Sequence, residues 1–440
     1  MKEAALRVVA EWLDRKAFPA MIKRDARKIK LDEAAEIIAI VGPRRAGKTF
    51  FMYQMMQEVM TNDTYSRTDF LFVDFEDYRL AQFLHDRPGE TVDALLIAFR
   101  QLTGKSPTFL FLDEIHRLPI WTSVVRTLHN QGTYKIVISG SNSELLEQEI
   151  ASELRGRYRN ILILPFSFRE VLRFRNISTE AVVEYTAGKG TILGAFDEYL
   201  KFGGFPEVVK QDDPEEKQRL LQSYFMTIFY KDILERYNIR TKFLLESMMS
   251  YCVNTYSDLF SISAFEKHLK AHSLPGSKRT ISNYLKYLKD AFFLIVNDKF
   301  SFSPGKRIMN PKKIYLLDTG FSCLAAAFSE NRGKTLENAV GIELLRRNEE
   351  QFYYKGSREC DFIIKLGTQP VRAIQVCWEL TAKNRNREFR GLAEAMNDLE
   401  IEKGLILTYD EEGQQEIGKY VIDLIPVGKW LLEGQKPMAS

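Results

Sequence analysis

The sequence has no apolar run long enough to cross a membrane. Its longest runs, such as Glu36–Val41 and Thr108–Leu112, have the length of a strand, whereas a membrane-spanning helix needs about 20 apolar residues. The N-terminal segment Met1–Leu6 mixes acidic and basic residues and lacks the apolar centre of a secretion signal. We therefore expect a protein without a membrane span that resides in the cytoplasm.

Cysteines are few, and an excess of charge is missing as well. The four cysteines, Cys252, Cys323, Cys360 and Cys377, are scattered and form no Cys-x-x-Cys pair. The sequence therefore suggests neither a zinc site nor a disulfide framework. A net charge of only +3 gives no global electrostatic reason to bind nucleic acid, so any such surface must be local.

The chain is long enough to form several hydrophobic cores. A single core stops growing near about 250 residues, so 440 residues predict two to four domains. Apolar residues make up 45% of the chain and charged residues 28%, which is typical of a folded globular protein. Changes in pattern along the chain give the predicted domains as 1–165, 166–256, 257–325 and 326–440.

The first predicted domain alternates buried strands with helices. A leading helix is expected over Leu6–Phe18. Continuous apolar runs, typical of strands buried on both faces of a sheet, predict strands at Ile37–Val41, Phe70–Val73, Phe109–Leu112 and Lys135–Ile138, and a short one at Ile161–Leu164. Helical patterns lie between them, and this alternation predicts a parallel α/β sheet.

A phosphate-binding loop follows the first of these strands. The segment Gly42-Pro43-Arg44-Arg45-Ala46-Gly47-Lys48-Thr49 fits G-x-x-x-x-G-K-[ST] and stands between a predicted strand and a predicted helix, the context that this motif requires. Its glycines let backbone N–H groups surround a phosphate at the start of a helix. We expect the loop to bind ATP, with Lys48 on the β- and γ-phosphates and Thr49 on Mg²⁺.

Two carboxylates, Asp113 and Glu114, directly follow the predicted strand Phe109–Leu112. Ligands of parallel α/β sheets bind at the carboxyl ends of the strands. Asp113 is therefore predicted to hold Mg²⁺ together with Thr49, and Glu114 to orient or deprotonate the attacking water.

A polar side chain after the strand Lys135–Ile138 is expected to sense the γ-phosphate. The segment there is Ser139-Gly140-Ser141-Asn142. Ser141 and Asn142 are both candidates, and the sequence does not choose between them.

This array of motifs resembles the AAA+ ATPase family, of the P-loop NTPase fold. The further motifs are Leu154–Tyr158 and, after it, Pro165–Glu170. The resemblance is to prokaryotic AAA+ ATPases that join this module to a winged helix and a nuclease-like C-terminal domain, and it spans nearly the whole chain. Its specific motifs are the phosphate loop and Asp113-Glu114.

The resemblance also implies an arginine that reaches the γ-phosphate of a neighbouring subunit. Arg157 is the first candidate for this finger and Arg155 the second, although both can also be surface or salt-bridge residues. A finger supplied by a neighbour neutralises charge on the transferred phosphoryl group. It implies a homo-oligomer, with a ring as one form of assembly.

The middle of the chain changes to a helical pattern, with a helical lid expected from about Ser167 to Tyr256. After it, a capping box at Ser263–Glu266 is predicted to open one helix, and Ser277 is predicted to cap a second. Strand candidates at Phe292–Val296 and Lys313–Leu317 follow, and this order suggests a winged helix.

The helix after Ser277 has the layout of a recognition helix. Ile281, Leu285 and Leu288 form an apolar stripe. Basic and amide residues suited to duplex or branched DNA form the other face: Lys278, Arg279, Asn283 and Lys286. Lys306 and Arg307 would lie in the wing and contact backbone phosphates. The alternatives are a solvated helix face or a module that docks protein.

The last third returns to an α/β pattern and resembles the PD-(D/E)xK nuclease, or restriction-endonuclease-like, fold. A helix is predicted over Leu336–Arg347, with strands at Gln351–Tyr354, Glu359–Lys365, Val371–Val376 and Gly404–Thr408. Glu343 and Asp361 stand at metal-binding positions, but Gln375 and Cys377 occupy the Glu-x-Lys positions. A metal ion would lack one carboxylate ligand, and the attacking water would lack the lysine that activates it. We therefore predict a domain without nuclease activity, in which Glu343 and Asp361 are structural.

The sequence therefore predicts a Mg²⁺-dependent, oligomeric ATPase that binds or remodels DNA. The alternative is a nucleotide-dependent signalling switch whose winged helix and C-terminal domain contact protein. An active nuclease driven by an ATPase motor is a third reading, which Gln375 and Cys377 disfavour.

Overall fold

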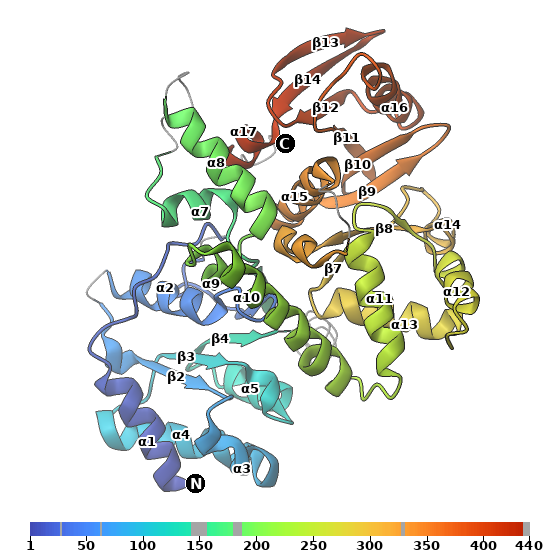
Figure 1. The fold of residues 1–440 in the computed structure, drawn as a ribbon. Helices are drawn as coiled ribbons and strands as arrows, with labels where there is room; N and C mark the ends of the chain where they lie inside the picture. Colours follow the sequence, from blue (N-terminus) through green and yellow to red (C-terminus); the bar gives the residue numbers. More distant parts are fainter. Residues whose placement is uncertain (27–28, 62–63, 142–155, 179–186, 327–330, 434–440) are drawn as a thin grey trace. The chain divides into compact units, whose positions relative to one another are not determined.

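The computed structural model describes the 440-residue chain except for residues 27–28, 62–63, 142–155, 179–186, 327–330 and 434–440 (Figure 1). The chain divides into two compact units, Met1–Leu164 and Pro165–Ser440. Each unit has hydrophobic core clusters of its own. The finer division of the second unit into three domains remains a prediction.

A five-stranded sheet forms the centre of the first unit. Its order is β2-β3-β4-β1-β5, and every pairing is parallel. The strands are β1 (Ile37–Val41), β2 (Phe70–Asp74), β3 (Phe109–Asp113), β4 (Lys135–Gly140) and β5 (Tyr158–Leu162). This confirms the predicted parallel α/β sheet, which has the arrangement of a P-loop NTPase fold.

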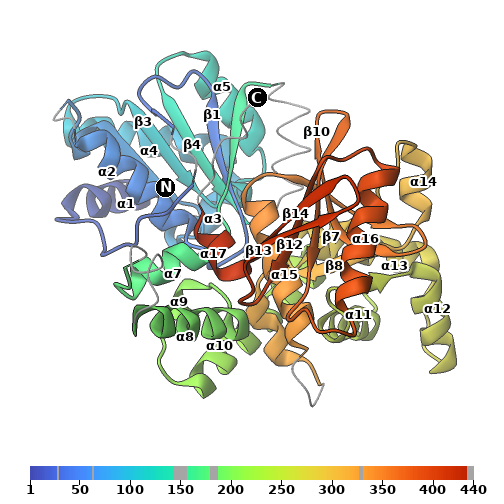
Figure 2. The same cartoon turned by 90° about the horizontal axis from the view of Figure 1, so that it is seen from above.

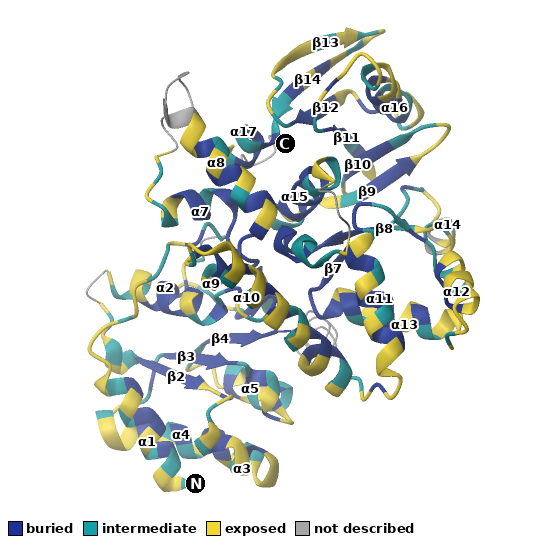
Figure 3. Ribbon diagram, viewed as in Figure 1, coloured by how far each residue is buried: buried dark blue, intermediate teal, exposed yellow. Residues whose placement is uncertain are grey.

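Helices cover this sheet, whose strands β1 to β4 are almost wholly buried, whereas β5 is partly exposed (Figure 3). They are α1 (Lys2–Asp14), α2 (Lys48–Met60), η1 (Arg67–Asp69), α3 (Tyr78–Asp86), α4 (Pro88–Thr103), η2 (Ile115–Arg117) and α5 (Trp121–Asn130). Aromatic and aliphatic side chains of β1, β2 and β3 share one core cluster with Trp12 of α1 and Met52 of α2. The indole Nε1 of Trp12 donates to the carbonyl of Phe70 at 2.7 Å, which fixes α1 against β2.

Two predicted bounds in this unit are wrong by several residues. The leading helix covers Lys2–Asp14 rather than Leu6–Phe18. The last strand covers Tyr158–Leu162 rather than Ile161–Leu164, because β5 follows the register of β1, in which Ile37 pairs with Tyr158.

The second unit begins with helices, as the pattern from Ser167 to Tyr256 predicted. They are α7 (Phe168–Phe174), α8 (Ala187–Phe202), α9 (Pro206–Val209), α10 (Pro214–Thr227), the π-helical segment η5 (Ile228–Glu235) and α11 (Lys242–Asn254). Ser167 caps α7 with a capping box to Glu170.

The next part carries two helices and a small antiparallel sheet. The helices are α12 (Ile262–Ala271) and α13 (Lys278–Asp290). The sheet has the order β6-β8-β7, formed by β6 (Leu259–Phe260), β8 (Lys312–Leu316) and β7 (Leu294–Asn297), and η6 (Thr319–Leu324) follows. Ser277 caps α13 by accepting from the Thr280 N–H, which confirms that prediction.

One prediction in this part is wrong. The cap of α12 is Ser261, which accepts from the Ala264 N–H, so Ser263 lies inside the helix. The helix starts earlier than expected because the chain leaves β6 directly at Phe260. Lys306 and Arg307 lie in the connection between β7 and β8, which contains a short helix, α14 (Pro304–Met309), with Pro304 at its start.

A six-stranded mixed sheet forms the end of the second unit, in the order β13-β14-β12-β11-β10-β9. Its strands are β9 (Glu350–Lys355), β10 (Glu359–Leu366), β11 (Gln369–Val376), β12 (Lys403–Thr408), β13 (Gly413–Ile417) and β14 (Tyr420–Pro426). The helices here are α15 (Arg332–Arg346), α16 (Arg385–Asp398) and α17 (Val427–Leu432). α16 packs on β10, β11 and β12 (Figure 2). The sequence pattern missed α16, α17, β13 and β14.

Across the described ranges, none of the helices combines the length and the apolar character that a bilayer crossing requires.

Candidate functional site

The phosphate-binding loop lies between the end of β1 and the start of α2, as its motif predicted. Gly47 is the N-cap of α2 with φ of 93°, a left-handed conformation that glycine adopts without strain. A Cβ atom on Gly42 would lie 2.0 Å from the carbonyl oxygen of Ile163. No larger residue fits at that position, because the backbone of the segment after β5 touches the loop there.

Lys48 is buried at the start of α2. Its Nζ donates to the carbonyls of Gly42 and Pro43, each at 3.2 Å, and lies 3.4 Å from Oε1 of Glu114. The ammonium is thus held by the loop itself, at the point where the motif places it against phosphate. Contacts to neutral carbonyls are weaker than charge-assisted bonds to phosphate oxygens, so the arrangement suits an exchange of partners when a nucleotide binds.

Asp113 and Thr49 lie side by side at the end of β3. The Thr49 hydroxyl donates to Oδ2 of Asp113 at 2.6 Å, and the Ser139 hydroxyl donates to Oδ1. Burial raises the pKa of Asp113 to about 6, and the nearby charge of Glu114 adds to this rise. A hydroxyl and a carboxylate in contact are oxygen donors of the kind that Mg²⁺ takes, so these two residues fit the predicted metal.

Glu114 has a backbone φ of 48°, which is uncommon for a residue other than glycine and often marks a functional position. Its N–H donates to the hydroxyl of Ser139 at 3.0 Å. Burial favours the neutral acid, but the charges of Lys48 and His116 outweigh it, so the pKa of Glu114 lies below its usual value. Glu114 is therefore ionised, as a residue that accepts a proton from water must be.

Ser139 is a site residue that the sequence reasoning missed, since it considered only Ser141 and Asn142. The register between β3 and β4 was the available signal: Leu112 pairs with Ile138, so the next residues, Asp113 and Ser139, are neighbours. Ser141 is buried, and its hydroxyl has no hydrogen-bond partner among the described residues. Asn142 lies outside the described part of the chain.

Arg24 and Glu76 also support the loop without having been predicted. Arg24 is buried and donates to the carbonyl of Ala46 at 2.7 Å and to that of Leu164 at 2.6 Å. Glu76 accepts from Arg44 at 3.0 Å and from Arg117 at 2.7 Å. Burial would raise the pKa of Glu76, but the two arginines lower it to about 2. Nothing in the sequence marked Arg24, whereas Glu76 belongs to an acidic segment after β2.

Arg157 lies away from the phosphate loop of its own chain. Its carbonyl accepts from the Ile37 N–H at 2.9 Å, at the amino end of β1. The loop follows the carboxyl end of the same strand, at the opposite edge of the parallel sheet. The guanidinium Nη1 of Arg157 donates to Oδ1 of Asn130 at 2.6 Å. Arg157 is therefore not part of its own chain's nucleotide site. Arg155 lies outside the described residues.

The predicted DNA-contact residues of α13 lie on its exposed face. Lys278, Arg279, Asn283 and Lys286 are all exposed, while the apolar stripe on the other side of the helix is buried. Arg307 of α14 is half-buried instead, and its Nε donates to the carbonyl of Ser301 at 2.6 Å.

The four predicted nuclease-like positions all contact neighbouring side chains or the backbone. Glu343 pairs with Arg346 at 3.2 Å and Arg347 at 2.9 Å. Asp361 accepts from Lys313 and from the Val376 N–H. Gln375 donates to Glu388 at 2.8 Å, and burial raises the pKa of the Cys377 thiol to about 12. Within the described ranges no group of three or more His, Cys, Asp or Glu side chains is arranged to hold a metal ion.

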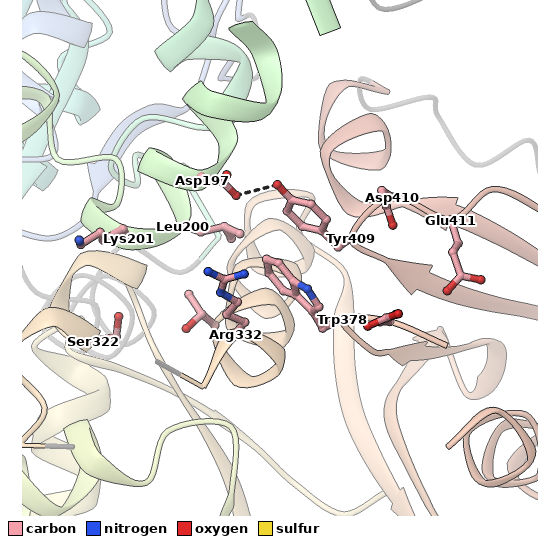
Figure 4. A pocket seen from close by; sticks show the side chains of 11 residues that line it. Asp197, Leu200, Lys201, Ser322, Arg332, Trp378, Tyr409, Asp410 and Glu411 are labelled. Carbon is pink, nitrogen blue, oxygen red and sulfur yellow. Dashed lines mark hydrogen bonds between the residues drawn. The ribbon is translucent and has the colours of Figure 1, made fainter. Parts of the chain in front are cut away.

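A separate pocket of about 660 Å³ lies in the second unit (Figure 4). Trp378 and Tyr409, which follow the neighbouring strands β11 and β12, stack with ring centroids 4.1 Å apart. The guanidinium of Arg332 lies 5.3 Å from the centre of the Trp378 ring, and the Tyr409 hydroxyl donates to Asp197. Trp378 and Tyr409 are both half-buried and line the pocket.

Comparison with known proteins gives consistent matches along the chain. Residues 34–172 match an AAA domain, and residues 193–332 and 332–430 match two domains of unknown function, DUF8612 and DUF4143. The uncharacterized protein MJ1544 of Methanocaldococcus jannaschii is 34% identical over 427 residues, 93% of this chain and 92% of that protein. An uncharacterized protein of Haemophilus influenzae is 28% identical over 94% of this chain and 99% of its own length.

Among solved structures, the Walker-type ATPase PABY2304 of Pyrococcus abyssi aligns with 73% of this chain and 94% of its own. The sequence identity is 13% and the TM-score is 0.43.

Proposed function

Because this chain belongs to the same family as MJ1544, and because its residues 34–172 match an AAA domain, we propose that it is a Mg²⁺-dependent ATPase of the AAA+ type that assembles into an oligomer and binds or remodels DNA. The observation that carries the proposal is the contact of Thr49 with Asp113 at 2.6 Å, beside Lys48 and Glu114. These are the four side chains that ATP hydrolysis requires from a phosphate loop and its neighbouring strand.

Each of these residues has a distinct task. The loop N–H groups bind the phosphates of the substrate ATP, and Lys48 turns from the carbonyls of Gly42 and Pro43 to the phosphate oxygens. Thr49 and Asp113 would hold Mg²⁺, which supplies charge stabilisation at the phosphates. Once Lys48 has moved, Glu114 loses its cation at 3.4 Å and can orient and deprotonate water.

The position of Arg157 supports assembly. It lies at the end of the sheet opposite its own phosphate loop, so a finger role would place it in the site of a neighbouring copy. Arg157→Ala should then lower turnover by at least about 100-fold while ATP binding persists. Asn130→Ala is the matched control, because it removes the partner of Arg157 and keeps the guanidinium. Equal losses in the two variants would contradict the assignment.

The exposed basic face of α13 supports DNA contact, and α12, α13 and the sheet β6-β8-β7 support the winged-helix interpretation of residues 257–325. Residues 166–256 would act as the lid, and residues 326–440 would be the inactive nuclease-like domain. Arg279→Ala/Lys286→Ala should weaken duplex binding and reduce its salt dependence, since lysines and arginines on phosphates release counterions. Lys403→Ala, at an exposed lysine of β12, is the control and should leave both unchanged.

The decisive experiment is the ATPase rate of the full chain with and without duplex and branched DNA. We expect DNA to stimulate turnover and Lys48→Ala to abolish it. A native chain that binds no ATP with Mg²⁺ would refute the proposal as a whole. A turnover that ignores DNA would instead favour the nucleotide-dependent switch, in which the same domains contact protein.

A further inference from the structure

A buried lysine stands among three carboxylates in the second unit. Lys313 lies on β8 and is only 2% exposed. Its Nζ lies 2.7 Å from a carboxylate oxygen of Glu337, 2.8 Å from one of Asp361 and 3.1 Å from one of Glu359. Glu337 belongs to α15, and the other two belong to β10. One ammonium thus gathers carboxylates from two other elements.

The carboxylates are positioned by further contacts that do not depend on Lys313. Glu337 accepts from the Tyr315 hydroxyl at 2.8 Å, and Asp361 accepts from the Val376 N–H at 2.9 Å. Glu359 pairs with Lys355 at 3.0 Å. Each of the three carboxylates thus keeps one contact besides Lys313.

This cluster needs a cation. Burying one unpaired carboxylate is costly, and three that share a site repel each other strongly. Burial alone would lower the pKa of Lys313, but the charges of Asp361 and Glu337 outweigh it and hold the pKa above its usual value. Lys313 therefore stays charged and compensates Asp361 and Glu359, while burial and the charge of Asp361 raise the pKa of Glu337 to about 8.

We infer that the Lys313 ammonium is the resident cation of a carboxylate site whose alternative occupant is a divalent metal ion, so that the native chain takes up no metal there. Carboxylate oxygens are the ligands of Mg²⁺, Mn²⁺ and Ca²⁺. The oxygens lie 2.7–3.1 Å from Nζ, and calcium–oxygen distances are about 2.3–2.6 Å, so inward shifts of a few tenths of an ångström would suffice.

The origin of Lys313 matters for this inference. β8 belongs to the small sheet β6-β8-β7, whereas Glu359 and Asp361 belong to the six-stranded sheet. The cation that fills the site thus comes from a different sheet than two of its carboxylates. Substitutions at Gln375 and Cys377 alone would not restore a metal site, because the position of the ion is already taken.

The test is Mn²⁺ binding to the full chain without nucleotide, measured by electron paramagnetic resonance. Lys313→Ala removes the ammonium and leaves room for an ion with its water. We expect this variant to bind about one Mn²⁺ more per chain than the native protein. Lys312→Ala, at the neighbouring residue of the same strand, whose lysine pairs with Asp298, is the matched control and should bind none in addition. Lys313→Ala/Asp361→Asn should lose the gain.

Thermal unfolding with and without Mn²⁺ gives a second readout. Metal should raise the unfolding temperature of Lys313→Ala by several degrees and leave the native chain unchanged. If Lys313→Ala is unfolded without metal, Mn²⁺ should restore its circular dichroism spectrum. The inference is overturned by a folded Lys313→Ala chain without the additional ion, by an unfolded one that Mn²⁺ does not rescue, or by equal nucleotide-free binding to the native chain.

Discussion

The molecule places a buried lysine beside carboxylates in two regions, and the two lysines differ in the contacts that hold them. In the phosphate loop, Lys48 contacts two neutral carbonyls at 3.2 Å and one carboxylate, Glu114, at 3.4 Å. In the second unit, Lys313 contacts three carboxylates at 2.7–3.1 Å. The first lysine can exchange its partners for a ligand, whereas the second is fully compensated.

The carboxylates of the two regions also differ in whether a cation is paired with them. Asp113 is held by two hydroxyls and no cation, and burial raises its pKa to about 6. Asp361 has an ammonium at 2.8 Å. Asp113, whose two hydrogen bonds come from hydroxyls, is available to bind a metal ion. Asp361, which is already paired with an ammonium, is not. The same residue types thus give a ligand site in one unit and a structural cluster in the other.

The largest effect on this comparison should come from replacing Glu114, the expected base of the nucleotide site. Glu114→Gln keeps the shape of the side chain but cannot accept a proton, so turnover should fall by roughly 100- to 1,000-fold with ATP affinity nearly unchanged. Steady-state ATPase rates and binding of a fluorescent ATP analogue would measure this. Glu90→Gln, at an exposed glutamate of α4, is the control. Native turnover in Glu114→Gln would remove Glu114 from its assigned role.

In the Lys313 cluster, breaking one ion pair should lower the stability of the fold rather than the ATPase activity. Asp361→Asn leaves Lys313 with less compensation, and the free energy of unfolding should fall by about 3 kcal/mol. Urea unfolding measures the change, and Asp423→Asn, at an exposed carboxylate of β14, should cost little. A change near zero would show that Lys313 does not depend on Asp361.

The same region should lack nuclease activity. Because Lys313 occupies the centre of the cluster, the native chain is expected to leave DNA intact in the presence of Mg²⁺ or Mn²⁺. Robust cleavage that Asp361→Ala abolishes would show that this expectation is wrong.

Asp318 extends the comparison to a carboxylate held by N–H groups alone. It accepts from Gly204 at 2.8 Å and Gly320 at 2.9 Å, and burial raises its pKa to about 6. A raised native pKa stabilises the fold below the unfolded pKa, near pH 4, and this stabilisation is lost as the pH rises through 6. Relative to Asp318→Asn, the native chain should lose about 3 kcal/mol over that range. Chemical unfolding at several pH values would show it, and parallel pH profiles would contradict it.

The smallest effect is expected at Ser141. Its buried hydroxyl, which lacks a hydrogen-bond partner in the described part of the chain, is available to a ligand. Ser141→Ala should slow turnover by about fivefold, since one neutral hydrogen bond contributes about 1 kcal/mol. Ser139→Ala removes the hydrogen bonds of Ser139 to Asp113 and to the Glu114 N–H, so this variant should hydrolyse ATP more slowly than Ser141→Ala. The reverse order would identify Ser141 as the more important contact.

The site was predictable where its residues are adjacent in sequence. The loop Gly42–Thr49 and the pair Asp113-Glu114 each follow an apolar strand, so local pattern placed them at one sheet edge. Ser139 required the register of β3 and β4, and Arg24 reaches the loop through contacts 22 and 140 residues away along the chain.

The second unit shows the same limit. Lys313 was expected only as the first residue of a strand, because its carboxylate partners stand 24 to 48 residues later. The strand β13 was missed because its exposed, polar residues break the apolar pattern. The strand β14 carries an apolar pattern, interrupted by Asp423, that was overlooked. Local sequence pattern does not predict elements that are stabilised mainly by tertiary contacts.

Arg24 joins the phosphate loop to the end of the first unit. One planar guanidinium holds the carbonyl of Ala46 with Nη1 and the carbonyl of Leu164 with Nη2. Leu164 is the last residue before the second unit begins at Pro165. Loss of the Arg24 side chain would therefore remove both contacts at once, so the phosphate loop and the last residue of the first unit depend on the same guanidinium.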